Sequence, residues 1–141
     1  MEGSTTTTEF YASDCSIKID LDKDDSSGAS GKDYKTASLC GQSSVLFVGD
    51  DDLTFYTGYR VDSIVARFQG SAPDAPFEYL SAQPKGNVSV TNIPNGVKMS
   101  YAGTFSLAKA NADYRAVLHT LRWHNTAPAP TGGQRLIEVI A

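Results

Sequence analysis

Carboxylate side chains are concentrated in two short stretches of the chain, where they could bind a metal ion. The first stretch is rich in Gly and Ser, and its aspartates are Asp20, Asp22, Asp24, Asp25 and Asp33. The second is an uninterrupted run of Asp50, Asp51 and Asp52. Calcium takes about six to eight oxygen ligands, which loops with clustered Asp and backbone carbonyls can supply. The sequence therefore makes both stretches candidate calcium loops.

Both stretches also have a simpler interpretation as hydrated turns. Asp and Ser favour turns because their side chains hydrogen-bond the local backbone. The adjacent carboxylates of residues 50–52 repel one another unless a cation or solvent separates them. Either a bound calcium ion or water would do this, so the repulsion is compatible with a calcium loop and with a hydrated turn. An EF-hand is excluded for the first stretch, because counting from Asp22 puts Ser27 at the position where that motif needs glycine.

Enzymatic chemistry has little support in the remaining side chains. His119 and His124 are the two histidines of the chain, and no nucleophile-elbow sequence surrounds any serine. Two histidines and two distant cysteines do not form a zinc-ligand spacing. We therefore expect a protein that is not an enzyme.

Two further features concern covalent modification. Cys15 and Cys40 both lie beside strand-like segments, so they either form a disulfide or remain free buried thiols. Asn87-Val88-Ser89 is an N-glycosylation sequon, which matters only in a eukaryotic secretory host.

The length and composition of the chain are typical of one folded domain. A chain of 141 residues with 40% hydrophobic and 20% charged residues fits a single core. The net charge is −4 and the basic residues are scattered, so we expect no nucleic-acid partner. No apolar run approaches a membrane span. We expect a Thr-rich flexible lead-in over residues 1–12 and a single domain over 13–141. Because the chain stops inside an apparent strand, we expect it to be a piece of a longer protein.

Alternation of apolar and polar residues predicts many short strands, with one helix late in the chain. Asn95-Gly96 is typical of a two-residue hairpin centre. The helix follows from Ala110, Tyr114, Val117, Leu118 and Leu121, which share one helical face, with Ser106 or Asn111 as its cap. The predicted strands cover residues 16–22, 45–48, 53–56, 61–68, 77–80, 87–92, 97–101, 121–125 and 135–141. This pattern indicates an all-β antiparallel sandwich of about seven or more strands.

Several segments, in order, resemble cadherin-like repeats, which are Ig-like β-sandwich modules of large calcium-binding adhesins and surface proteins. The C-terminal segments are Gly103–Ala108, Asp113–Leu118, Leu121–Thr126 and Pro130–Ile137, and Ile19–Tyr34 is similar to the opening of such repeats. The resemblance covers most of residues 17–140. One departure is Tyr56–Tyr59, where these repeats often carry acidic residues, and it puts one family calcium position in doubt.

The resemblance implies an extracellular or cell-surface module with an adhesive or spacer role, calcium as its cofactor, and neighbouring modules, a surface protein or a glycan as partners. An alternative is a module that recognises carbohydrate or another ligand with the loops at one end of the sandwich. Trp123 and exposed tyrosines could stack on sugars, although the alternation of Trp123 with Leu121 favours core packing. A hydrolase accessory or autoprocessing domain is a third alternative.

Overall fold

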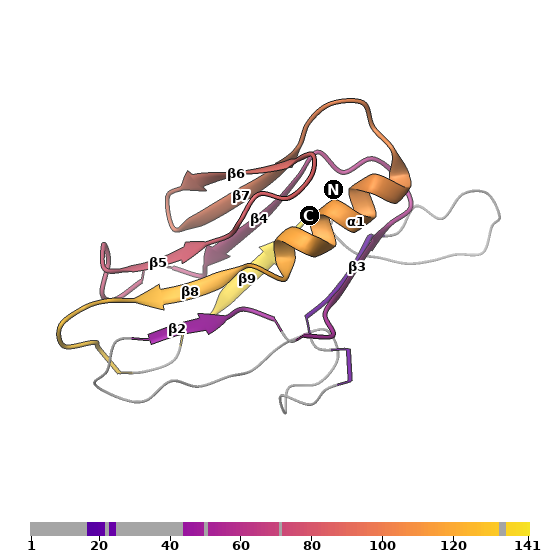
Figure 1. The fold of residues 1–141 in the computed structure, drawn as a ribbon. Helices are drawn as coiled ribbons and strands as arrows, with labels where there is room; N and C mark the ends of the chain where they lie inside the picture. The colour runs from indigo at the N-terminus through magenta and orange to yellow at the C-terminus, as the bar shows by residue number, and fades with distance from the viewer. Residues whose placement is uncertain (1–16, 22, 25–43, 50, 71, 133–134) are drawn as a thin grey trace.

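The computed structural model of the chain describes residues 17–21, 23–24, 44–49, 51–70, 72–132 and 135–141. Within these ranges the chain forms nine strands and one helix (Figure 1). The helix α1 (Leu107–Leu118) lies between the seventh and eighth strands. The strands are β1 (Ile17–Asp20), β2 (Ser44–Phe47), β3 (Thr54–Thr57), β4 (Ser63–Phe68), β5 (Glu78–Ser81), β6 (Val88–Ile93), β7 (Gly96–Tyr101), β8 (Arg122–Asn125) and β9 (Ile137–Ile140).

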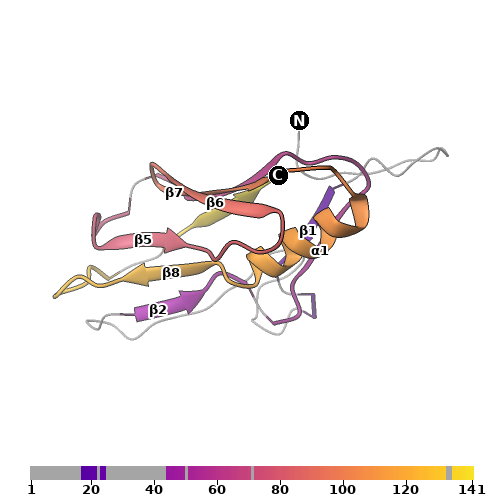
Figure 2. The ribbon, with the colours of Figure 1, turned by 45° about the horizontal axis from the view of Figure 1, so that its top comes forward.

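The strands form three sheets, and every pairing between them is antiparallel. The largest sheet has the order β6–β7–β4–β9, a second has the order β2–β8–β5, and β1 pairs with β3 in a two-stranded ribbon. Figure 2 shows the two larger sheets as layers, with α1 and β1 toward one end. This architecture confirms the predicted all-β, sandwich-like fold with one short helix near the C-terminal end.

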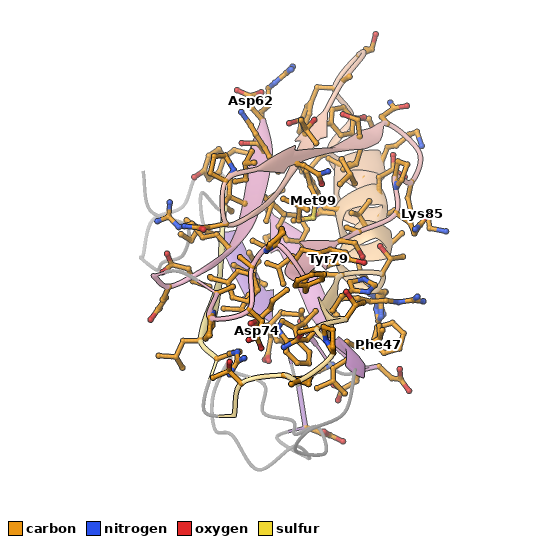
Figure 3. The ribbon with its side chains drawn as sticks, turned by 90° about the vertical axis from the view of Figure 1, so that its left-hand side faces the viewer. Phe47, Asp62, Asp74, Tyr79, Lys85 and Met99 are labelled. Carbon is orange, nitrogen blue, oxygen red and sulfur yellow. The ribbon has the colours of Figure 1, made fainter. Side chains whose placement is uncertain are left out.

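The core lies between the layers and is built by alternation along the strands. In β4, Ile64 and Ala66 are fully buried and Phe68 nearly so, whereas the residues between them are not. Val97 and Met99 do the same in β7, and Met99 lies in the interior in Figure 3. Successive side chains of a strand point to opposite faces, so each strand gives one row to the core.

The helix closes one end of the sandwich with the apolar face that the sequence predicts. Ser106 is its N-cap, since the Ser106 hydroxyl accepts a hydrogen bond from the Lys109 backbone N–H. The predicted stripe from Ala110 to Leu121 is buried. Tyr114 is fully buried and donates its hydroxyl hydrogen to the Val61 carbonyl at 2.9 Å. This burial raises the pKa of Tyr114 to about 12.

A polar side chain of the helix also pairs with the backbone of β3. The Asn111 side-chain oxygen accepts from the Thr57 N–H at 2.7 Å, and its amide nitrogen donates to the Thr57 carbonyl at 3.1 Å. Asn111 thus gives Thr57 the two hydrogen bonds that a neighbouring strand would give. The predicted alternative role of Asn111 as a helix cap is wrong, because this side chain lies within the first turns of α1 and faces β3.

The turn between β6 and β7 is displaced by one residue from the prediction. Ile93 and Gly96 form a register pair, so the two loop residues are Pro94 and Asn95 rather than Asn95 and Gly96. Pro94 is suited to the first central position of a turn, and Asn95, with φ of 68°, occupies the left-handed region at the second. Gly96 instead lies against β4, where an added Cβ would overlap the Ala66 carbonyl oxygen and come within 2.7 Å of the Arg67 Cα.

We expect Gly96→Ala to lower the free energy of unfolding by about 3 kcal/mol or more, because the new methyl group would collide with backbone that cannot move aside. Chemical denaturation measures the change. Gly132→Ala is the control, since nothing lies within 4 Å of its added Cβ. A loss at Gly96 no larger than that at Gly132 would contradict the close approach of β4 and β7.

Candidate functional site

The pairing of β1 with β3 brings together the described parts of the two predicted acidic stretches. Asp20, at the end of β1, is in register with Thr54, at the start of β3. The segments that follow Asp20 and precede Thr54 therefore lie side by side. Their approach is close at Gly49, where an added Cβ would come within 3.3 Å of the Leu21 carbonyl oxygen and 2.9 Å of the Leu53 side chain.

The Asp52 carboxylate holds the first acidic stretch directly. One oxygen accepts from the Lys23 backbone N–H and the other from the Asp24 backbone N–H, each at 3.0 Å. Each carboxylate oxygen has a second lone pair that these bonds leave available. The structure thus joins two aspartate-rich segments that are nearly 30 residues apart in sequence.

Half of the predicted ligands can be placed in this arrangement. Asp20, Asp24, Asp51 and Asp52 lie on the two joined segments. Among the described residues no three Asp, Glu, His or Cys side chains are grouped closely enough to hold a metal ion. The other predicted ligands, Asp22, Asp25, Asp33 and Asp50, lie outside the described residues, as do Cys15, Cys40 and residues 1–12.

At Tyr56–Tyr59, where the sequence departs from the cadherin-like pattern, the structure shows contacts of Thr57 with α1. Thr57 is fully buried, and Asn111 satisfies its backbone. Its hydroxyl donates to the Tyr59 carbonyl at 2.7 Å. Thr57 therefore joins β3 to α1 through its backbone.

The other predicted site residues are accounted for by packing. Trp123 is partly buried against the core, and its indole N–H donates to Glu78 at 2.8 Å, so the predicted core packing is confirmed. Asn87 is half-buried at the start of β6, and its amide nitrogen donates to the Tyr101 hydroxyl at 3.2 Å.

A buried charged network, which the sequence reasoning missed, lies at the end of the sandwich where β5 begins. Asp74 marks this end in Figure 3. The Arg135 guanidinium donates to Glu78 at 2.6 and 3.1 Å and to Asp74 at 3.3 Å. The Glu78 side chain is fully buried, and those of Asp74 and Arg135 are 10% and 12% exposed. Asn125 and Thr131 complete the network by donating to Asp74.

The alternation of β5 contains a signal that could have revealed this network. Leu80 is a core residue, and Glu78 precedes it by two positions, so both must point inward. An inward carboxylate requires a charged or hydrogen-bonding partner. The identity of that partner, Arg135, could not be read locally because 57 residues separate the two.

A serine and a histidine also meet across two strands. Ser81 Oγ and His124 Nε2 are 2.7 Å apart, and the lowered pKa of His124, caused by burial and by Arg122, favours the neutral ring. A catalytic pair of this kind needs a third group that orients the base. Among the described residues no hydrogen bond to His124 Nδ1 is present.

In comparisons with known proteins, no family model, curated protein or solved structure matches the chain. Within the described part of the chain, no helix has the length and apolar character needed to cross a membrane.

We expect Arg135→Met to lower the free energy of unfolding by about 3–5 kcal/mol, because it leaves the buried Glu78 carboxylate without its cation. Arg67→Met is the matched control. Arg67 pairs with Glu138 at 2.7 Å, but those side chains are 49% and 30% exposed, and exposed pairs contribute about 1 kcal/mol or less. Equal losses in urea denaturation would contradict the structural role of the buried pair.

Acid should weaken the same network. Hydrogen bonds from the Thr131 hydroxyl, Asn125 and the Thr131 N–H lower the pKa of Asp74 below its ordinary 3.8. Its stabilisation is therefore present above about pH 4 and is lost as the pH falls through the folded-state pKa. We expect the free energy of unfolding to decline below pH 4 in the wild type and to decline less in Asp74→Asn. Parallel pH profiles for the two proteins would contradict this assignment.

Proposed function

We propose that the chain is a non-catalytic, cadherin-like module of an extracellular or cell-surface protein, with an adhesive or spacer role between neighbouring modules. The observation that carries the proposal is the junction at Asp52, where two aspartate-rich segments meet. Calcium bound at this junction would stiffen the loops, as the resemblance to cadherin-like repeats leads us to expect. Asp20, Asp24, Asp51 and Asp52 are the described carboxylates on the two segments, and they would have to move closer together to share one ion, because no three of them are grouped in the structure.

The hydrogen bonding of the rest of the described sandwich suits a spacer. Every buried side-chain nitrogen and oxygen in the described residues has a hydrogen-bond partner, and partly satisfied polar groups are where a fold opens most easily. Four separate parts of the chain, β5, β8, the loop around Thr131 and the segment before β9, are joined through Asp74, Glu78 and Arg135. A module of this construction would transmit force between its neighbours without local opening.

The carbohydrate alternative has less support. The aromatic ring best suited to stack on a sugar, that of Trp123, packs against the core and has its indole N–H bonded to Glu78. The loop at the Asp74 end is likewise occupied by its own contacts, since Thr131 donates twice to Asp74.

We expect millimolar calcium to raise the thermal midpoint, because a ligand that binds only the folded state stabilises it, by about 2.7 kcal/mol at 100 times the dissociation constant. The comparison is a melt in calcium against a melt in chelator, with magnesium as a second cation. Asp52→Asn should lose most of the calcium-dependent increase, whatever its own midpoint.

Asp62→Asn is the matched control, since that carboxylate is 82% exposed and pairs with Arg60 away from the junction. It should keep the full calcium-dependent increase. A midpoint that calcium leaves unchanged in the wild type would refute the calcium role, and an increase that survives in Asp52→Asn would move the site elsewhere.

A further inference from the structure

The outer face of the β2–β8–β5 sheet carries large apolar side chains in solvent. The strand register aligns Val45, His124 and Tyr79 in one row across the sheet. Phe47, Arg122 and Ser81 form the next row. Val45 is 54% exposed, Phe47 48% and Tyr79 43%. Figure 3 labels Phe47 and Tyr79 on the two edge strands of this sheet. We call these six residues the aromatic face.

The opposite sheet shows that such exposure is not a general property of the sandwich. The outward positions of β6, β7, β4 and β9 are mostly polar: Ser63, Arg67, Ser89, Thr91, Lys98, Ser100 and Glu138. Arg67 and Glu138 form an ion pair there. Three apolar residues lie on that face, Val65, Ile140 and Ile93, and all three are half-buried. Exposed apolar side chains that lie together can mark an interaction site, and the aromatic face brings together Val45, Phe47 and Tyr79.

Five of the six side chains of the aromatic face contact another member of the face. The Tyr79 and His124 rings stack with centroids 4.6 Å apart and planes 8° from parallel. The Arg122 guanidinium lies 4.9 Å from the centre of the Phe47 ring. Ser81 holds the His124 ring through its Nε2. A preorganised surface loses little conformational entropy when it binds.

This stacking also decides which class of ligand the face can take. Neighbouring strands are about 4.8 Å apart, so two parallel rings at 4.6 Å must stand upright on the sheet, because rings lying flat would collide. Upright rings present their edges to solvent, and the Phe47 ring face is covered by Arg122. Sugars stack on exposed ring faces, and here His124 takes one face of the Tyr79 ring and Arg122 one face of the Phe47 ring. Apolar side chains of a protein can pack between ring edges.

Charge adds a second requirement on the partner. Arg122 is exposed and is the only formally charged residue among the six. No ion pair joins Arg122 to a carboxylate of the described residues, and its charge helps to lower the pKa of His124, after burial. In a chain of net charge −4 this is an isolated cation within an apolar surface. A carboxylate on the partner would complement it.

The size of the face fits a short segment rather than a folded partner. Three strands of four residues cover about 190 Å², given about 4.8 Å between strands and about 3.3 Å per residue. A stable interface between folded proteins buries about 800 Å² on each partner. We propose that the aromatic face binds an extended segment of a partner protein that carries a carboxylate between apolar side chains.

This proposal adds a partner to the adhesive role proposed above, and its test uses neither calcium nor the acidic loops, so the two can fail separately. The probe is a phage-displayed library of random twelve-residue peptides, selected on the immobilised chain in chelator. Selected peptides are then synthesised, and their affinities are measured by fluorescence anisotropy. We expect enrichment of peptides with Asp or Glu flanked by apolar residues, with affinity falling as salt is raised.

Variants locate the binding. Arg122→Gln and Val45→Ser should each weaken binding at least tenfold, because one removes the cation and the other an exposed apolar side chain. Both positions are exposed, so we expect the variants to keep the wild-type fold, which far-ultraviolet circular dichroism checks. Arg67→Gln, on the polar sheet, is the control and should bind like the wild type.

Several results would overturn the proposal. No enrichment over an uncoated surface would do so, as would selected peptides that lack acidic residues. Equal affinity for the wild type and Arg122→Gln would also exclude the aromatic face. A glycan array provides the last outcome: binding of acidic glycans that depends on Arg122, without peptide binding, would replace the protein segment with a sugar ligand.

Discussion

The ion pair between Arg135 and the buried carboxylate of Glu78 is the interaction that holds the end of the sandwich where β5 begins. Alternation along β5 puts Glu78 on the inner face beside Leu80. A buried carboxylate is costly unless it is paired and hydrogen-bonded. Arg135 and Trp123 both donate to Glu78, which ties the segment before β9 to β5 and β8. The strong hydrogen bond to Glu78 raises the pKa of Arg135, so the cation is present at any physiological pH.

The helix supplies the corresponding connections at the other end. Asn111 binds the backbone of Thr57 in β3, and Tyr114 binds the Val61 carbonyl. Burial favours a higher pKa for Asp113, but hydrogen bonds from the Asn87 N–H and Lys109 hold the pKa of that carboxyl below its ordinary value. Asn111 thus takes the place of a strand neighbour beside β3. Both ends of the sandwich are held by side chains that bridge elements far apart in sequence.

Local patterns in the sequence were sufficient for the elements but not for these bridges. Alternation located each strand to within about two residues, and the period of Ala110, Tyr114 and Val117 located α1 and its buried face. Asn95-Gly96 indicated the right hairpin, although the glycine serves the close approach to β4 and not the turn itself. Local periodicity carries no information on which distant partner satisfies Glu78, Asp113 or Thr57, because those contacts depend on how the sheets pack.

Only part of the candidate site could likewise be predicted from the sequence. Counting aspartates identified both acidic stretches, but their junction required the register of β1 with β3 and the hydrogen bonds that Asp52 accepts. The aromatic face was not recognised at all from the sequence, since Val45, Phe47 and Tyr79 resemble core residues until the order β2–β8–β5 shows which side is covered. Exposure is a property of the packed sandwich.

We propose that the Asp52 junction is the calcium site of a structural module. A calcium titration followed by amide chemical shifts tests it most directly, because the Lys23 and Asp24 N–H groups donate to the Asp52 carboxylate and will sense a cation there. We expect saturable shifts concentrated at Lys23, Asp24, Asp51 and Asp52, with the amides of the β6–β7–β4–β9 sheet unchanged. Shifts that are absent up to millimolar calcium, or that fall elsewhere, would contradict the account.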